Sequence, residues 1–201
     1  MTLRRGLLIV IEGIDGSGKT TQAKSLLRRL RRRGHRVAFF REPTRGPWGR
    51  EIKRRAARAG SLTPAEELDL FVRDRRENVE RNLKPALRRG QIVVLDRYYF
   101  STIAYQGAKG IDPSRIRRLN ETFAVKPDLV IVLDIAAPDG LARIAGRTMR
   151  DELFEREDYL VRVREIFRKL RGRNIVHLDG SGERRAVGRA VWSRVQKLLP
   201  Y

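Results

Sequence analysis

Five runs of mostly apolar residues, each of strand length, are spaced along the chain. They lie at residues 7–11, 37–40, 92–95, 129–133 and 175–178. Apart from His177, these runs do not alternate between apolar and polar positions. A continuous apolar run is typical of a strand in a parallel sheet, because helices cover both faces of such a sheet.

Apolar residues at helical spacing fill the segments between these runs. In the segment 20–33 they share one face, and Gly34 is a typical helix stop. Thr63-Pro64-Ala65-Glu66 has the spacing of a capping box and predicts the start of a long helix, which Pro85 bends or ends. Further helices are predicted at 113–123, with Asp112 as the cap, at 138–145 and at 183–199.

The alternation of strands and helices predicts an α/β protein with three layers, in which a five-stranded parallel sheet is flanked by helices. We expect Ile116, Leu119 and Phe123 to face the core. No repeat or linker divides the chain, so residues 1–201 are predicted to form a single domain. Ligands of such sheets bind beyond the carboxyl ends of the strands, which makes the residues directly after each strand the candidates for chemistry.

Composition and charge exclude several classes of protein. The 201 residues include 45 Lys and Arg against 24 Asp and Glu, which gives a net charge of +21. Cysteine is absent and histidine occurs twice, so disulfide scaffolds, cysteine nucleophiles and thiolate or histidine-rich metal sites are excluded. No apolar run reaches the roughly 18 residues that span a bilayer, and we expect a soluble, cytoplasmic protein.

The first predicted strand leads into a phosphate-binding loop. Residues 13–20 read Gly-Ile-Asp-Gly-Ser-Gly-Lys-Thr, which matches G-x-x-x-x-G-K-T between a strand and a helix. In this loop the backbone N–H groups surround phosphates, the lysine reaches the β and γ phosphates, and the Thr hydroxyl binds Mg²⁺. The loop predicts a P-loop NTPase fold and, in the absence of an N-K-x-D motif, a small kinase. The predicted triphosphate-binding residues are Gly13, Asp15, Gly16, Ser17, Gly18, Lys19, Thr20 and Thr21.

Asp96 and Arg97 follow the third predicted strand directly. An Asp at that strand end, facing the phosphate loop, can hold Mg²⁺ together with Thr20. An Arg beside it can grip a second phosphate with two parallel hydrogen bonds. The pair therefore predicts a metal site and an acceptor that carries a phosphate group.

With these features the chain resembles the thymidylate kinase family, whose members transfer the γ-phosphoryl group of ATP to dTMP. The resemblance rests on the loop, on Arg41-Glu42-Pro43-Thr44, on Leu-Phe-Val-Arg-Asp-Arg at 70–75, and on Asp96-Arg97-Tyr98 followed by Ser-Thr-Ile-Ala-Tyr-Gln-Gly at 101–107. It covers nearly the whole chain. Residues 44–49, Thr-Arg-Gly-Pro-Trp-Gly, depart from the Gly-Gly-Thr-Pro-Leu-Gly form of many bacterial members. Acceptance of dUMP or other deoxynucleotides therefore stays open.

The resemblance implies an acceptor site. Phe71 would stack on the thymine ring, and Arg75, one helical turn further on, would donate to the thymine O4. Arg97 would bind the acceptor phosphate, Asp15 would lie near the sugar 3′-hydroxyl and the metal, and Tyr105 would lie where a ribose 2′-hydroxyl would project. The other implied acceptor residues are Arg41, Glu42, Pro43, Lys53, Ser101, Thr102 and Gln106.

A basic segment after the fourth predicted strand, at about 143–155, is expected to form a short lid. The family either carries an Arg inside the phosphate loop or supplies it from the lid. Gly16 occupies that loop position, so the chain resembles the lid-arginine pattern. Arg143 is expected at ATP, and Arg147 and Arg150 join Lys19, Arg97 and Asp15 as expected catalytic residues. Which of these three lid arginines acts in catalysis stays open.

The resemblance implies ATP- and Mg²⁺-dependent phosphorylation of dTMP to dTDP, in the synthesis of dTTP, by a homodimer that needs neither membrane nor nucleic acid as a partner. Two alternatives remain. One is a kinase of another nucleotide, deoxynucleotide or nucleoside. The other is a basic nucleic-acid-binding protein with a vestigial ATP site, which only the net charge of +21 favours.

Overall fold

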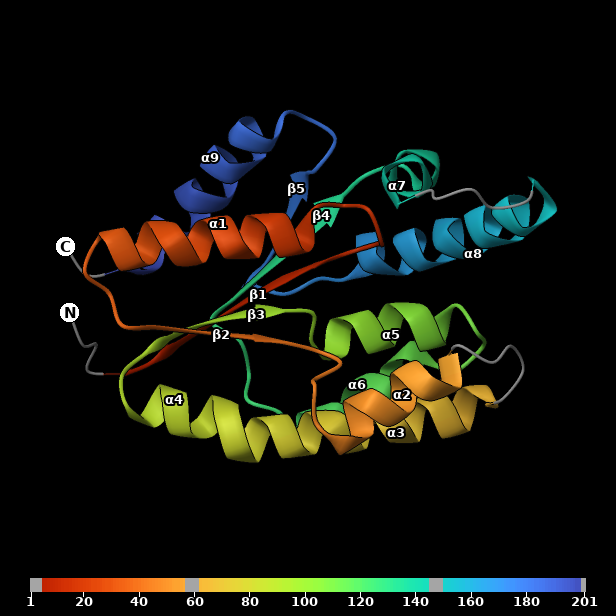
Figure 1. Cartoon of the computed structure of the whole chain (residues 1–201), viewed down its shortest axis with the longest axis horizontal. Coiled ribbons are helices and arrows are strands. Elements are labelled where there is room, and N and C mark those ends of the chain that lie inside the picture. Colours follow the sequence, from red (N-terminus) through yellow and green to blue (C-terminus); the bar gives the residue numbers. More distant parts are fainter. Residues whose placement is uncertain (1–4, 57–61, 145–149, 200–201) are drawn as a thin grey trace.

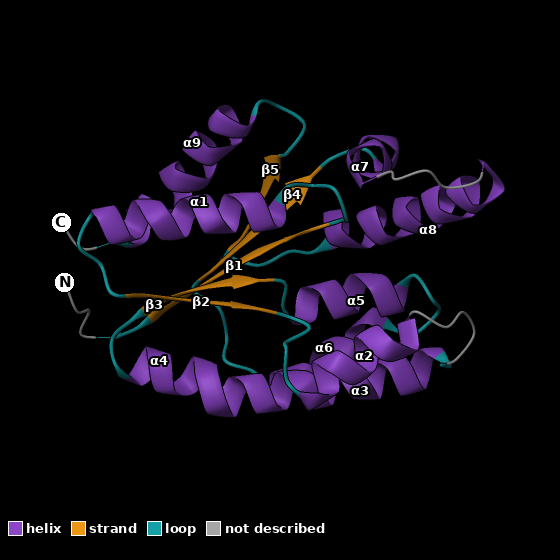
Figure 2. Cartoon of the chain, in the orientation of Figure 1, coloured by secondary structure: helices purple, strands orange, loops and turns teal. Residues whose placement is uncertain are grey.

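A five-stranded parallel sheet forms the centre of the protein (Figure 1, Figure 2). The structure is a computed structural model that describes residues 5–56, 62–144 and 150–199, except for the side chains of 150–156. The strand order is β2-β3-β1-β4-β5, and every neighbouring pair is parallel. This confirms the predicted fold class. The strands are β1 (Leu7–Gly13), β2 (Val37–Arg41), β3 (Ile92–Asp96), β4 (Leu129–Asp134) and β5 (Ile175–Asp179).

Helices cover both faces of the sheet (Figure 2). On one face, α1 (Lys19–Arg32) and α9 (Arg184–Val195, followed by a 3₁₀ turn at Gln196–Leu198) pack against a cluster that includes Ile9, Ile11 and Val94. On the other face lie α3 (Pro64–Asn78), α4 (Lys84–Arg88), α5 (Tyr99–Gly107), α6 (Pro113–Glu121), α7 (Ala137–Ile144) and α8 (Arg150–Lys169). The remaining helix, α2 (Pro47–Ala56), packs on α3.

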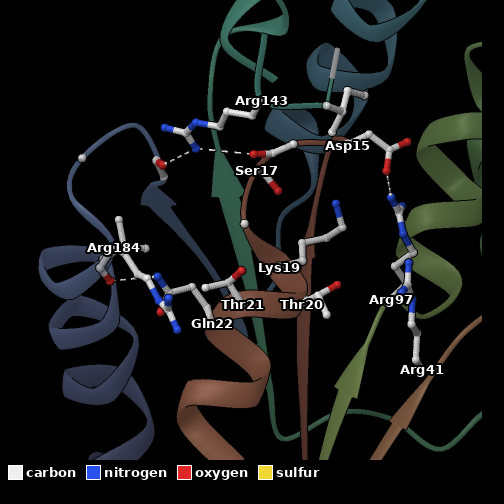
Figure 3. Close-up of a pocket in the computed structure, with 16 residues that line it drawn as sticks. Asp15, Ser17, Lys19, Thr20, Thr21, Gln22, Arg41, Arg97, Arg143 and Arg184 are labelled. Atoms are coloured by element: carbon white, nitrogen blue, oxygen red, sulfur yellow. Dashed lines mark hydrogen bonds and ion pairs between the residues drawn. The ribbon is translucent and has the colours of Figure 1, made fainter. Parts of the chain in front are cut away.

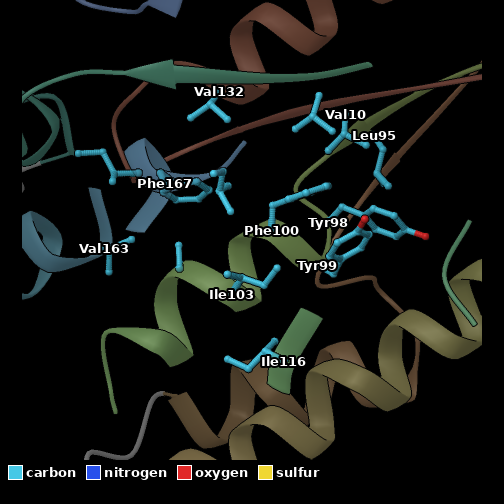
Figure 4. Packing of buried hydrophobic residues seen from close by; sticks show 14 of the residues in the cluster. Val10, Leu95, Tyr98, Tyr99, Phe100, Ile103, Ile116, Val132, Val163 and Phe167 are labelled. Atoms are coloured by element: carbon cyan, nitrogen blue, oxygen red, sulfur yellow. The ribbon is translucent and has the colours of Figure 1, made fainter. Parts of the chain in front are cut away.

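The second face holds the larger apolar cluster (Figure 4). Val10, Leu95 and Val132 point into it from the sheet, and Ile103 and Phe167 meet them from α5 and α8. Because consecutive side chains of a strand point to opposite faces, each central strand contributes to both clusters. The continuous apolar runs of the sequence have this origin.

Local signals set the helix ends. The Thr63 hydroxyl accepts from Glu66 N at 3.3 Å and the Glu66 carboxylate accepts from Thr63 N at 2.8 Å, which completes the predicted capping box. The long helix does not end at Pro85. A π-helical turn over Val79–Leu83 precedes the proline, and α4 continues to Arg88. A π turn is one way for a helix to accommodate a residue that lacks an N–H.

Three helices, α2, α5 and α8, are absent from the sequence-based prediction. In α5 nearly every residue is buried, so the chain shows no polar face there. The expectation for Leu119 is wrong, because its side chain is 37% exposed. The buried stripe of α6 runs instead through Ile116 and Asn120, four residues apart. No helix in the described part of the chain is long and apolar enough to cross a membrane.

Candidate active site

The phosphate loop connects β1 to α1 and depends on glycine at positions with a left-handed backbone. Gly13, Gly16 and Gly18 have φ angles of 137°, 79° and 87°. A Cβ on Gly16 would also collide with the backbone carbonyl of Gly140 in α7. The hydroxyl of Ser17 is buried without a hydrogen-bond partner among the described residues. Such a backbone turn at a helix start is suited to an anion.

Lys19 extends from the start of α1 into a cavity of about 560 Å³, called here the loop cavity (Figure 3). Its Nζ donates to Ile14 O at 2.5 Å. Burial and the nearby charge of Arg97 lower the pKa of Lys19 to about 7. An anion bound in the loop would raise that pKa again, because it stabilises the charged amine.

Thr20 and Asp96 bring a hydroxyl and a carboxylate together beneath the loop. Thr20 Oγ1 donates to Asp96 Oδ2 at 2.6 Å, and Arg41 Nε lies 3.7 Å from the same oxygen. Asp96 Oδ1 is buried and has no hydrogen-bond partner among the described residues. Mg²⁺ prefers oxygen ligands of this kind and keeps sites open to water and substrate phosphates. These two residues therefore fit the predicted metal.

Arg97 follows β3 with a φ of 70°, which is rare outside glycine. Its Nη2 donates to Asp15 Oδ1 at 2.5 Å and its Nη1 donates to Ser101 Oγ at 3.1 Å. Burial raises the pKa of Asp15, but the charges of Arg97 and Lys19 outweigh it and hold the pKa below its ordinary value. The ion pair therefore fixes the guanidinium at the edge of the loop.

Glu12 supports this arrangement from β1; it directly follows the predicted strand 7–11 and so was among the candidates, but the sequence analysis assigned it no role. Its carboxylate accepts from Tyr98 N at 2.7 Å, from Ser101 N at 3.2 Å and from Ser101 Oγ at 2.6 Å. Burial raises the pKa of Glu12 to about 7, although the Ser101 hydrogen bond lowers it. The residue anchors the start of α5 next to Arg97. Its sequence signal is a charged residue inside an apolar strand.

A second cavity, of about 300 Å³ and called here the Phe71 cavity, lies between α3 and α5. Ten of the twelve predicted acceptor residues line it: Asp15, Glu42, Pro43, Phe71, Arg75, Arg97, Ser101, Thr102, Tyr105 and Gln106. Arg41 and Lys53 do not. Both line a separate cavity of about 750 Å³ beside β2 and α2, and Arg41 also reaches the loop cavity.

Arg75 is 1% exposed and is held on three sides. Its Nε donates to Glu42 Oε2 at 2.8 Å, its Nη1 to Asn120 Oδ1 at 2.7 Å and its Nη2 to Thr102 Oγ1 at 3.0 Å. A guanidinium has five N–H groups, so these bonds leave two for a ligand in the cavity. The network presents a fixed donor in the same cavity as the ring of Phe71, one helical turn along α3.

Glu67, Lys109 and Tyr159 also line the Phe71 cavity and were not predicted. Lys109 Nζ donates to Glu67 Oε2 at 2.5 Å, and Tyr159 Oη donates to Tyr105 O at 2.9 Å. Glu67 lies on α3, Lys109 lies in the turn after α5, and Tyr159 belongs to the unpredicted α8. Only the tertiary packing brings them together, so no spacing in the sequence marks them.

Arg143 lies on the far side of the loop cavity from Arg97 (Figure 3). It donates to Gly180 O at 3.2 Å and to Ser181 O at 3.0 Å in the segment after β5. Of the predicted triphosphate residues, all but Gly13 line this cavity. Residues 145–149 of the expected lid, Arg147 among them, lie outside the described residues, as does the side chain of Arg150.

The two cavities meet at one ion pair. Asp15 and Arg97 line both the loop cavity and the Phe71 cavity. A ligand held by the phosphate loop and a second ligand held between Phe71 and Arg75 would therefore have their facing ends at Arg97. The arrangement suits transfer of a group from one bound molecule to another.

The chain is similar to known proteins over almost its full length. The family model described as thymidylate kinase matches residues 11–191. The thymidylate kinase of Xanthomonas campestris pv. campestris (strain B100) is 48% identical over 180 residues, which is 89% of this chain and 78% of that protein. The thymidylate kinase of Akkermansia muciniphila is 45% identical over 196 residues, 98% of this chain and 92% of that protein.

A solved structure agrees with these relatives. The crystal structure of thymidylate kinase from Ehrlichia chaffeensis matches with a TM-score of 0.76 at 29% identity, and covers 95% of this chain and 99% of that one. Since the family model spans most of the chain and relatives are nearly half identical, this chain belongs to the thymidylate kinase family.

Proposed function

We propose that the protein phosphorylates dTMP to dTDP with ATP as the phosphoryl donor, and that it does so in the cytoplasm as part of dTTP synthesis. The observation that carries this proposal is the shared wall of the two cavities. Asp15 and Arg97, 2.5 Å apart, face the phosphate loop on one side and the Phe71 cavity on the other. Family membership supplies the identity of the two substrates.

On the donor side, the backbone of the loop and Lys19 bind the triphosphate, and Arg143 bounds the opposite wall of the cavity. Thr20 and Asp96 would hold Mg²⁺, which would supply positive charge that neutralises the phosphates. Lys19 acts as a fixed positive charge once the triphosphate has raised its pKa from about 7. Arg147 and Arg150 would add charge from the lid.

On the acceptor side, Phe71 offers an aromatic face for the base and Arg75 a donor for the thymine O4. The 4-amino group of cytosine cannot accept that hydrogen bond, so Arg75 selects against dCMP. Tyr105, bonded to Asp15 at 3.0 Å, closes the cavity beside the sugar and selects against a 2′-hydroxyl. Arg97 holds the acceptor phosphate.

The reaction requires positioning and charge neutralisation, since no general base is needed. The acceptor phosphate is already an oxyanion at neutral pH. One of its oxygens attacks the γ-phosphorus of ATP, the bond from that phosphorus to the β,γ-bridging oxygen breaks, and ADP leaves. Arg97 aligns the two phosphates and stabilises the charge that spreads over the transferred group.

A turnover assay tests the proposal. Purified protein is mixed with ATP, Mg²⁺ and one acceptor at a time: dTMP, dUMP, ribose TMP, dCMP or thymidine. We expect ADP and dTDP, with the highest kcat/KM for dTMP. Preference for thymidine or dCMP would retain a kinase but overturn the roles of Arg75 and Arg97. Absence of turnover in folded protein that binds ATP would overturn the proposed activity and favour a binding protein.

We further propose that the active form is a homodimer and that each chain is one domain. The first point rests on the resemblance to the thymidylate kinase family, which implies a homodimer. Light scattering after size exclusion measures the mass directly. A mass of 23.2 kDa at working concentration would contradict the dimer.

A further inference from the structure

Arginines of α1 and α9 line a cavity that the proposed reaction does not use. The two helices pack against each other on one face of the sheet (Figure 1). The cavity between them has a volume of about 290 Å³, and none of its lining residues is Asp or Glu. We call it the arginine groove, after its five arginines Arg29, Arg32, Arg184, Arg185 and Arg189.

The helices that form the groove do not balance its charge. Neither α1 nor α9 contains an acidic residue. On the opposite face, several cations are paired within their own helices, as in Arg73 with Asp69 at 2.7 Å in α3 and Arg117 with Glu121 at 3.4 Å in α6. None of the five groove arginines forms an ion pair with a carboxylate in the described part of the chain. Positive charge is therefore concentrated here.

The direction of α9 adds to this charge. Arg184 and Arg185 occupy its first turn, where the helix dipole favours acidic residues, and no side chain caps the helix start. On α1, desolvation and the charges of Arg33 and Arg32 lower the pKa of Arg29. The cluster is self-repelling in the absence of a ligand, and an anion in the groove would relieve that repulsion.

Trp192 forms the floor of the groove. The guanidinium groups of Arg29 and Arg33 lie 4.3 Å and 4.7 Å from its ring centroid, and the residue is only 6% exposed. The ring is therefore not available to stack on a nucleobase, as the aromatic residues of single-strand-binding proteins do. What the groove presents to a ligand is guanidinium groups, which bind phosphate oxygens with paired hydrogen bonds.

A contact between the helices separates the groove from the loop cavity. Gln22 Nε2 donates to Arg184 O at 3.0 Å, and both residues line the two cavities (Figure 3). Arg32 and Arg189 line only the groove. These two positions can thus be changed without touching the residues assigned to ATP or dTMP.

We propose that the arginine groove binds a compact oligophosphate anion at a site separate from that of ATP. Several guanidinium groups around one concave space suit adjacent phosphates, such as those of pyrophosphate or tripolyphosphate. A nucleic acid would instead follow an extended basic stripe and benefit from stacking rings. The proposal goes beyond the kinase activity and does not depend on it.

Calorimetric titration with tripolyphosphate tests the site, with Mg²⁺ in fixed excess in cell and syringe. We expect two bound ions per chain, of which only one is displaced by a non-hydrolysable ATP analogue. The double variant Arg32→Ala, Arg189→Ala should weaken the undisplaced site by about tenfold or more and leave the other unchanged. Both positions are exposed on helices, where alanine is well tolerated, so the fold and dTMP phosphorylation should persist.

The matched control is Arg88→Ala, Arg89→Ala, which removes the same charge from exposed positions at the end of α4, on the opposite face of the sheet. If the groove variant and the control variant lost affinity for tripolyphosphate equally, net charge alone would explain the loss, and the proposal would be overturned. Binding of only one tripolyphosphate per chain, fully displaced by the ATP analogue, would overturn the proposal as well. The proposal would also be overturned if a single-stranded oligonucleotide bound through Arg32 and Arg189 more tightly than tripolyphosphate does, with an affinity that rises with its length.

Discussion

At the scale of single residues, the reaction depends on where Arg97 holds its guanidinium. We expect Arg97→Ala to lower kcat by about 100-fold or more, because the transition state loses a preorganised cation. ATP affinity should change little, since the loop backbone and Lys19 remain. Pre-steady-state phosphoryl transfer and equilibrium binding of an ATP analogue measure the two effects separately.

Arg164 provides the control for this variant. Its Nε donates to Asp134 Oδ1 at 2.6 Å at the end of β4, outside both substrate cavities. Arg164→Ala thus removes a similar ion pair at a strand end without touching a substrate. If it slowed transfer as much as Arg97→Ala does, the loss would come from a general disturbance of the sheet edge.

Glu12 makes stability depend on pH. Its pKa is about 7 in the folded protein and near the ordinary value of 4.5 in the unfolded chain, so the folded state binds the extra proton between these pH values. The stability that this proton contributes is complete below about pH 4.5 and is lost as pH rises to about 7. As pH rises across this window, the free energy of unfolding of Glu12→Gln should increase by roughly 1–3 kcal/mol relative to that of the wild type.

Urea unfolding of both proteins at pH 5, 6, 7 and 8 measures this difference. Glutamine can accept from Tyr98 N and Ser101 N and donate to Ser101 Oγ, so the hydrogen bonds of Glu12 persist in the variant. Glu51→Gln is the control, because the hydrogen bonds from Arg54 and Arg55 lower the pKa of Glu51 to about 2. A difference between wild type and Glu12→Gln that is constant from pH 5 to 8 would contradict the assignment.

At the scale of elements, the capping box at Thr63 should contribute measurably to α3, which carries Phe71 and Arg75. Thr63→Ala removes the acceptor for Glu66 N and should lower the free energy of unfolding by about 1 kcal/mol. Thr63→Ser keeps the hydroxyl and should stay within a few tenths of the wild type. The midpoints of denaturant unfolding, measured with an unchanged m-value, compare the two variants. Equal destabilisation by the two substitutions would show that the Thr63 hydroxyl does not stabilise α3.

The elements also show how far the sequence alone could lead. Strands β1 to β5 and helices α1, α3, α6, α7 and α9 could be predicted from the local sequence. The unpredicted α5 is buried on nearly all sides, so it lacks the polar face by which a helix is recognised. The phosphate loop could be predicted because its chemistry is contiguous in sequence. Glu67, Lys109 and Tyr159 could not, because two helices and a turn that are far apart in the sequence bring them to one cavity.

At the scale of the whole molecule, the two apolar clusters share the sheet. Val10 faces one cluster and its neighbours Ile9 and Ile11 face the other, so neither layer of helices can leave without exposing the same strands. We therefore expect a single unfolding transition for the chain. The two tryptophans allow a test, because Trp192 lies in α9 on one face and Trp48 lies in α2, which packs on α3 of the other.

Leu30 is fully buried in the cluster beneath α1 and α9. Leu30→Ala should cost about 2–5 kcal/mol through lost burial and the cavity left behind. In a background of Trp48→Phe the fluorescence reports the layer of Trp192, and in Trp192→Phe it reports the layer of Trp48. One cooperative domain requires Leu30→Ala to shift both transitions by the same amount. A shift confined to the Trp192 signal would mean that the two helix layers unfold as separate units.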